Sequence, residues 1–112
     1  MSFVTLSIAY ELARLVEPVI RRIAVKDRTL ADQLRRAIAS IPLNLAEGNE
    51  LCDRSRLHHF RAAAGSAREV EAALRTAEAL RYVDMADIAT ALHYADRLHA
   101  LLYMLIHPRS KR

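Results

Sequence analysis

The chain has too few turn-forming residues to build a fold of many short elements. Its 112 residues include only two glycines and three prolines. Hydrophobic residues make up 53% of the chain while aromatics make up only 5%, so the core must be mostly aliphatic. Small aliphatic side chains suit closely packed helices better than sheets. We therefore expect an all-α protein with few, long helices, forming one domain over residues 1–112 that ends in a short basic tail, 107–112.

Apolar residues recur at intervals of three or four along four segments, which is the period of one helix face. Ser2 or Thr5 can cap the first helix, and its apolar period continues across Pro18. We expect this helix to bend rather than break at the proline. A second apolar set makes its apolar face unusually wide: Ala9, Ala13, Val16 and Ile20.

Polar residues mark where the remaining helices begin and end. Asp27 can cap the second helix, and Asp53 or Ser55 can start the third. Asp84 and Asp87, spaced three apart before an apolar run, resemble the capping box of a fourth helix. Pro108 stops that helix. Four helices with short connections predict an up-and-down antiparallel four-helix bundle.

The stretch Ser40–Gly48 places both a proline and a glycine inside the second helix. Pro42 should bend the helix, because it lacks a backbone donor and crowds the carbonyl four residues earlier. Gly48 should close the helix in the left-handed conformation. Asn44 and Glu47 then lie one turn apart near the helix end, where polar groups on a core helix need partners.

Basic residues outnumber acidic ones, but the excess is concentrated at one end. The net charge is +4, from 17 basic and 13 acidic residues. Leaving out Arg109, Lys111 and Arg112 reduces the basic residues to 14, so the body of this basic protein is nearly neutral. Any functional field must therefore come from local clusters.

Two local clusters of basic residues are candidate nucleic-acid sites. The first lies within residues 54–68, which contain no acid, and consists of Arg54, Arg56, His58, His59, Arg61 and Arg68. The second lies near the first connection and consists of Arg21, Arg22, Lys26 and Arg28. In an up-and-down bundle these clusters fall at opposite ends. Arginine forks suit phosphates and carboxylates equally, so a solvated face explains the clusters as well as a nucleic-acid site does.

The sequence offers little for catalysis, metal binding or a cofactor. The single cysteine, Cys52, excludes an internal disulfide and reads as an incidental turn residue. Asp96-x-x-His99 occurs once, whereas di-metal helix bundles need such a pair on two helices. We expect Asp96 and His99 to solvate a helix face or to bond each other. These observations predict a protein without catalytic or cofactor-binding residues.

Apolar segments predict self-association rather than membrane insertion. The longest apolar run, residues 100–106, is far shorter than the roughly 20 residues that span a bilayer. No amino-terminal segment resembles a signal peptide, so we expect a cytoplasmic protein. This run and the wide face of the first helix would leave exposed apolar patches on a monomer, which usually mark an interface.

Three strings of the sequence resemble a known family. They are Gln33-Leu34-Arg35-Arg36-Ala37, the Ser40–Gly48 stretch Ser-Ile-Pro-Leu-Asn-Leu-Ala-Glu-Gly, and Gly65-Ser66-Ala67-Arg68-Glu69-Val70-Glu71 followed by Leu74. They resemble a four-helix-bundle family that includes proteins encoded in intervening sequences of bacterial 23S ribosomal RNA genes. The related accessory variability determinants of diversity-generating retroelements belong to it too.

The resemblance implies a homopentameric barrel of four-helix bundles with a basic surface that engages nucleic acid. In the retroelement branch it also implies a partnership with a reverse transcriptase. It further suggests partners for the polar line of the second helix. Gly65 would let the third helix approach closely, Arg36 would pair with Glu69, and Asn44 and Glu47 would bond Ser66 or nearby backbone.

The leading hypothesis is a non-catalytic homo-oligomeric scaffold that binds RNA or an RNA–DNA hybrid. The first choice for phosphate contacts is Arg54, Arg56 and Arg61, and the second is Arg21, Arg22, Lys26 and the tail. One alternative is a structural or protein-interaction oligomer whose arginines pair with its own acids. Another is a metalloenzyme built on Asp96 and His99.

Overall fold

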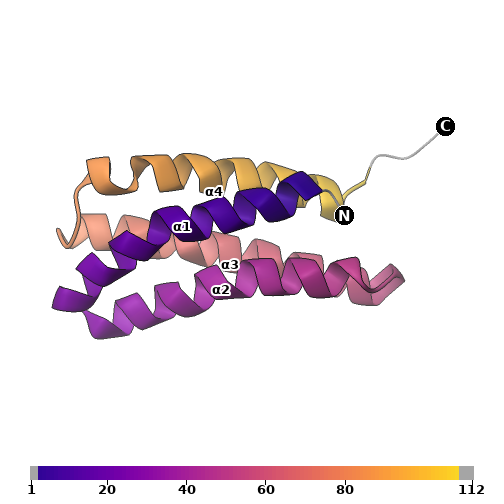
Figure 1. Cartoon of the computed structure of the whole chain (residues 1–112), viewed down its shortest axis with the longest axis horizontal. Helices are drawn as coiled ribbons and strands as arrows, with labels where there is room; N and C mark the ends of the chain where they lie inside the picture. The colour runs from indigo at the N-terminus through magenta and orange to yellow at the C-terminus, as the bar shows by residue number, and fades with distance from the viewer. Residues whose placement is uncertain (1–2, 109–112) are drawn as a thin grey trace.

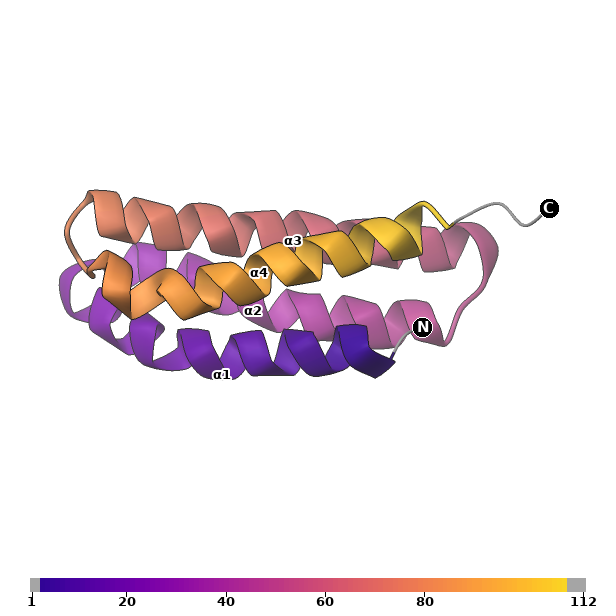
Figure 2. The same ribbon diagram turned by 90° about the horizontal axis from the view of Figure 1, so that it is seen from above.

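The protein folds into four long helices, as the sequence predicts. The computed structural model describes residues 3–108, in which α1 is Phe3–Lys26, α2 Arg28–Asn49, α3 Asp53–Ala79 and α4 Met85–Ile106. Each helix packs antiparallel to the next, and α4 also packs against α1, which closes the bundle (Figures 1 and 2). The α1–α2 and α3–α4 turns lie at one end, and the α2–α3 turn lies at the other beside the start of α1 and the end of α4.

The core is aliphatic, and the wide apolar face of α1 is buried inside it. Ala9 and Val16 are fully buried, Ile20 is 4% exposed, and Ala13 is partly buried against the core. They need no second copy of the chain to cover them, because α1 lies between α2 and α4. The prediction that this face is exposed on a monomer is therefore wrong. At the end of α4, by contrast, Tyr103 and Met104 remain 63% and 65% exposed.

Two predicted caps are confirmed at the end of the bundle that holds the α1–α2 and α3–α4 turns. Oδ1 of Asp27 accepts the backbone N–H of Leu30 at 2.9 Å, as an N-cap does. Its Oδ2 accepts the hydroxyl of Tyr82 at 3.1 Å, and this hydrogen bond raises the pKa of Tyr82. At the start of α4, the backbone N–H of Asp84 donates to Asp87 Oδ2 at 2.8 Å, within a capping box.

Two of the three prolines lie inside helices, and the cap predicted for α1 at Thr5 does not form. Helices α1 and α2 continue through Pro18 and Pro42, while Pro108 follows the end of α4. Thr5 does not cap α1, because it lies inside the helix with its hydroxyl buried and without a hydrogen-bond partner among residues 3–108. Ser2, the other candidate cap, lies outside the described residues.

The two glycines have roles other than those predicted. Neither has a positive φ, and α2 continues past Gly48 to Asn49. A β-carbon at Gly48 would lie 2.8 Å from Cε1 of Phe60, so this glycine allows α3 to pack closely on α2. Gly65 is exposed, and a β-carbon there would meet nothing within 4 Å. The close approach predicted at Gly65 occurs instead at Gly48.

Among residues 3–108, no helix combines the length and apolar character needed to cross a membrane.

Candidate nucleic-acid interface

The outer face of α3 carries an arginine at every seventh position. We call Arg54, Arg61, Arg68 and Arg75 the arginine row. Seven residues make nearly two helical turns, so the four side chains lie in line, about 10.5 Å apart along the helix axis. All four are exposed, because the opposite side of α3 carries the buried residues that hold it in the bundle.

Three members of the arginine row have no acidic partner in the part of the chain that the structure describes. Nε of Arg75 lies 3.1 Å from Glu71 Oε2, which forms an ion pair one turn apart. Within residues 3–108, no carboxylate lies within 4 Å of the guanidinium of Arg54, Arg61 or Arg68. Their positive charge is therefore available to an external anion.

Arg56, a first choice from the sequence, is held by the protein itself. Its Nε donates to the carbonyl of Leu51 at 3.1 Å and to that of Gly48 at 3.4 Å. Its guanidinium carbon lies 5.9 Å from the ring centroid of Phe60. Carbonyls at a helix end lack intrahelical partners, and Arg56 supplies one. We therefore remove Arg56 from the predicted phosphate contacts.

The second predicted cluster lies at the opposite end of a bundle 50 Å long, and two of its four members are neutralised by ion pairs. Arg21 pairs with Glu17 at 2.9 Å, and Arg22 pairs with Asp87 at 2.8 Å. Lys26 and Arg28 are exposed and make no ion pair within the described residues. The tail residues Arg109, Lys111 and Arg112 lie outside those residues.

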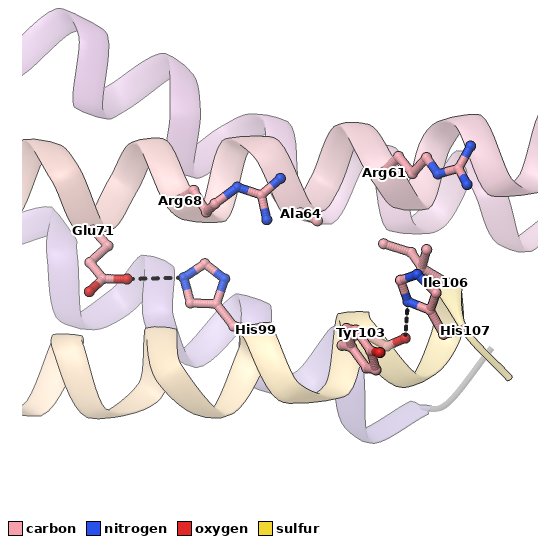
Figure 3. A pocket seen from close by; sticks show the side chains of 8 residues that line it. All are labelled: Arg61, Ala64, Arg68, Glu71, His99, Tyr103, Ile106 and His107. Atoms are coloured by element: carbon pink, nitrogen blue, oxygen red, sulfur yellow. Dashed lines mark hydrogen bonds and ion pairs between the residues drawn. The ribbon is translucent and has the colours of Figure 1, made fainter. Parts of the chain in front are cut away.

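A cleft of about 580 Å³ opens between α3 and α4 beside the arginine row (Figure 3). Its polar and aromatic lining consists of Arg61, Arg68, Glu71, His99, Tyr103 and His107. A second hollow, of about 430 Å³, is lined by Leu51, Arg54, Ser55, His58, His59 and Arg61. Arg61 lines both hollows, so they adjoin along α3.

Side chains within the α3–α4 cleft are already ordered by internal contacts. Nε2 of His99 donates to Glu71 Oε1 at 3.2 Å, because a carboxylate can only accept. The rings of Tyr103 and His107 stack with centroids 4.2 Å apart at an interplanar angle of 28°. Nδ1 of His107 also donates to the carbonyl of Tyr103 at 3.3 Å. The cleft thus combines free guanidinium groups with a stacked aromatic pair.

The polar network between α2 and α3 contains Asn44 and Ser66, as predicted, and adds Ser40 and His59. Nδ2 of Asn44 donates to the carbonyl of Ser40 at 2.9 Å and to its Oγ at 3.0 Å, and the hydroxyl of Ser66 donates to the same Oγ at 2.9 Å. Oδ1 of Asn44 accepts from His59 Nδ1 at 2.9 Å. Asn44 therefore reaches Ser66 through Ser40 and extends to His59.

Charged residues take no part in this network. Arg36 and Glu69 line one shallow pocket with Ser40 and Ser66, but both are exposed, and no ion pair joins them within the described residues. Glu47 is also exposed, and its side chain makes no hydrogen bond to any residue that the structure describes. The predicted buried pair of Arg36 with Glu69 is wrong, because both side chains lie at the rim of the α2–α3 contact.

The side chains considered for metal binding or nucleophilic catalysis are not grouped into a site within residues 3–108. His99 bonds Glu71 on α3 rather than Asp96 on its own helix. Cys52 is an exposed free thiol at the start of α3. Across residues 3–108, no three His, Cys, Asp or Glu side chains are grouped to hold a metal ion.

Sequence reasoning placed Arg68 in the acid-free cluster but did not choose it for phosphate contact, although its seven-residue spacing from Arg61 could have shown that it lies in line with Arg54 and Arg61. It missed two further residues of this interface. Tyr103 and His107 are four residues apart, a spacing that places side chains on one helix face. Nothing in the sequence shows that this face meets α3.

Comparisons with known proteins agree with the fold. A family model described as 23S rRNA-intervening sequence protein matches residues 4–104. A solved structure from Bacteroides thetaiotaomicron, described as a protein of unknown function from the S23 ribosomal protein family, is similar with a TM-score of 0.82. The two chains share 18% identity, and the match covers 92% of this chain and 98% of that one. This likeness shows the fold alone. No curated protein matches the sequence.

Proposed function

This chain belongs to the family of 23S rRNA-intervening sequence proteins, and we propose that it binds RNA through the arginine row without catalysing a reaction. The observation that carries the proposal is that Arg54, Arg61 and Arg68 lie exposed and in line without an acidic partner among residues 3–108. The planar guanidinium fork matches phosphate oxygens with two parallel hydrogen bonds. A row on a rigid helix presents these forks at fixed spacing.

The row favours contact with the phosphate backbone rather than with base edges. Phosphate contacts position a protein on nucleic acid but carry little sequence information. We therefore expect strong dependence on salt and weak dependence on sequence. An RNA–DNA hybrid offers the same phosphates, and competition between the two kinds of duplex would rank them.

The experiment compares two triple variants that remove equal charge from different faces. R54Q/R61Q/R68Q removes the unpaired members of the arginine row. R14Q/R21Q/R35Q is the matched control, because these exposed arginines pair with acids on their own helices. Binding of a fluorescently labelled structured RNA is measured by anisotropy at low salt.

The arginine-row variant should bind much more weakly than the control. Three contacts of about 1 kcal/mol each, the value for unit charges 4 Å apart in water, correspond to a loss of roughly 150-fold. Equal losses in both variants would show that only net charge matters. Absence of binding by the parent protein at low salt would end the proposed RNA role.

Assembly as a homo-oligomer is a further part of the proposal. Val25, Leu43 and Met104 are 83%, 68% and 65% exposed, and large exposed apolar side chains favour an interface. Several copies would present several arginine rows to one RNA. Light scattering should give a mass of five 12.6 kDa chains if the pentamer implied by the family resemblance forms. A monomeric mass would contradict assembly.

The same exposed apolar side chains favour a second candidate function, a structural or protein-interaction oligomer with no nucleic-acid role. A pull-down from cell extract separates the two. Nuclease-sensitive material in the eluate supports RNA binding, whereas protein partners that persist after nuclease treatment support the second candidate. The partnership with a reverse transcriptase stays a prediction.

A further inference from the structure

We propose that the α3–α4 cleft holds one unpaired nucleotide of a bound RNA strand. Its base would stack on Tyr103, and its phosphate would bind Arg61 and Arg68. This inference rests on the proposed RNA binding and adds a preference for single-stranded segments, together with a residue outside the arginine row that contacts the base.

The cleft has the size and walls of a ligand site. Its volume of about 580 Å³ falls within the roughly 300–1,000 Å³ typical of small-molecule pockets. Figure 3 shows that Arg61 and Arg68 come from α3, whereas His99, Tyr103 and His107 come from α4. The charged wall and the aromatic wall therefore belong to different helices that the bundle holds at fixed separation.

The charged wall presents a net positive field despite the acid among its lining residues. Both oxygens of Glu71 are occupied, because Oε1 accepts from His99 at 3.2 Å and Oε2 accepts from Arg75 at 3.1 Å. Arg61 and Arg68 have no carboxylate within 4 Å in the described chain. An entering phosphate thus meets two free guanidinium groups and an acid already paired with Arg75.

The aromatic wall is a prepared stacking platform. Tyr103 is 63% exposed, which is high for a large ring on a packed helix. His107 stacks against it with centroids 4.2 Å apart, and its Nδ1–H donates to the carbonyl of Tyr103. Because His107 already orders the Tyr103 ring, stacking of a base on that ring costs little further side-chain entropy. Stacking on an aromatic ring accepts any base.

The combination selects an unpaired nucleotide over a duplex. Bases within a duplex are already stacked on their neighbours, so their faces are closed to a protein side chain. An unpaired nucleotide joins an anionic phosphate to a free planar base. The cleft offers a matching pair of features, with two cations on one wall and an aromatic face on the other. If a second copy of this chain occupied the cleft instead, it would have to place an acidic side chain against Arg61 and Arg68.

The test uses Tyr103→Ala with two matched controls. Tyr10→Ala removes an exposed tyrosine from α1, and Met85→Ala removes an exposed apolar side chain from the other end of α4, away from the cleft. Binding is measured by anisotropy with an unstructured single-stranded RNA, the same strand with abasic positions, and a duplex RNA of equal length. Light scattering on each variant reports the oligomer mass, and thermal melting confirms folding.

Tyr103→Ala should weaken binding of the single-stranded RNA about fivefold or more, the lower end for loss of one stacked base. The two control variants should bind the single-stranded RNA as tightly as the parent does, and so should Tyr103→Phe. Tyr103→Ala and the parent should have equal affinity for the duplex and for the abasic strand.

Equal weakening on duplex and single strand, or equal weakening by Met85→Ala, would overturn the nucleotide site. A changed oligomer mass with unchanged RNA affinity would also overturn it and assign Tyr103 to contact between copies. The arginine-row variant R54Q/R61Q/R68Q separates this failure from that of the proposed function. If it still loses affinity for both RNAs, RNA binding stands and only the nucleotide site falls.

Discussion

Helices α1 and α3 both carry arginines on their outer faces but use them differently. On α1, Arg14 lies 3.1 Å from Glu11, and Arg21 lies 2.9 Å from Glu17. On α3, Arg54 and Arg61 have no acid three or four residues away within the helix, and Glu71, three residues after Arg68, pairs with Arg75 instead. The placement of acids three or four residues from each arginine, more than the number of arginines, decides which face is open to an anion.

The paired arginines of α1 add little to stability. Exposed ion pairs of this kind are worth about 0.3–0.5 kcal/mol, because water and side-chain entropy offset most of the attraction. Their main consequence is that they cancel charge on that face. The unpaired row of α3 costs the fold little and leaves its field intact.

The largest effect should come from disturbing the packing that positions α3. Gly48→Ala places a β-carbon 2.8 Å from Cε1 of Phe60, so the ring or the helix must shift. Overpacking of this kind costs about 1–3 kcal/mol. Urea unfolding should show this loss, and RNA affinity at a temperature where the variant is folded should change much less. A variant as stable as the parent would show that the α2–α3 contact is looser than described.

The next effect should come from giving α3 the acid spacing of α1. In H58E/G65E, each new glutamate lies three or four residues from two arginines: Glu at position 58 from Arg54 and Arg61, and Glu at position 65 from Arg61 and Arg68. Two neutralised contacts of about 1 kcal/mol each would weaken RNA binding roughly thirtyfold. The neutral control H58Q/G65Q should bind like the parent. Equal binding by the two double variants would break the comparison between the helices.

A smaller effect should appear at Gly65 alone. This glycine is exposed within a helix, and a β-carbon there would meet nothing within 4 Å. Gly65→Ala should therefore raise stability by about 0.5–1 kcal/mol, because alanine restricts the unfolded chain and favours the helix. RNA affinity should stay at the parent value. A loss of affinity with a gain in stability would instead show that RNA approaches the bare backbone at this position.

The smallest effect should come from freeing the arginines of α1. E11Q/E17Q removes the acids that pair with Arg14 and Arg21. Stability should fall by less than about 1 kcal/mol for the two exposed pairs. RNA affinity at low salt should rise only severalfold, because the freed arginines are not aligned with the α3 row. A gain as large as the loss in R54Q/R61Q/R68Q would mean that net charge alone governs binding.

The parts of the fold that the sequence predicted depend on local chemistry. The apolar period defined four helices, and the caps at Asp27 and Asp84 are made by side chains within three residues of the groups they bond. The role of Gly48 could not be read in this way, because it depends on Phe60 arriving from another helix. The same holds for the buried wide face of α1, which the sequence suggested was exposed.

The candidate site was predicted in part for a similar reason. Arg54 and Arg61 were identified from the acid-free run, which is a property of the sequence alone. Arg56 lies in the same run but bonds the carbonyls at the end of α2, and only the geometry of the α2–α3 turn decides that. The cleft with Tyr103 and His107 exists because α4 returns along α3.

The salt dependence of RNA affinity tests the central claim most directly. For the parent and for R54Q/R61Q/R68Q, the logarithm of the association constant is plotted against the logarithm of salt concentration. Each phosphate contact contributes about 0.7–0.9 to the slope, so loss of three contacts should make the variant's line shallower by roughly 2–3. Two parallel lines would contradict the account, because they would show that Arg54, Arg61 and Arg68 do not contact phosphate.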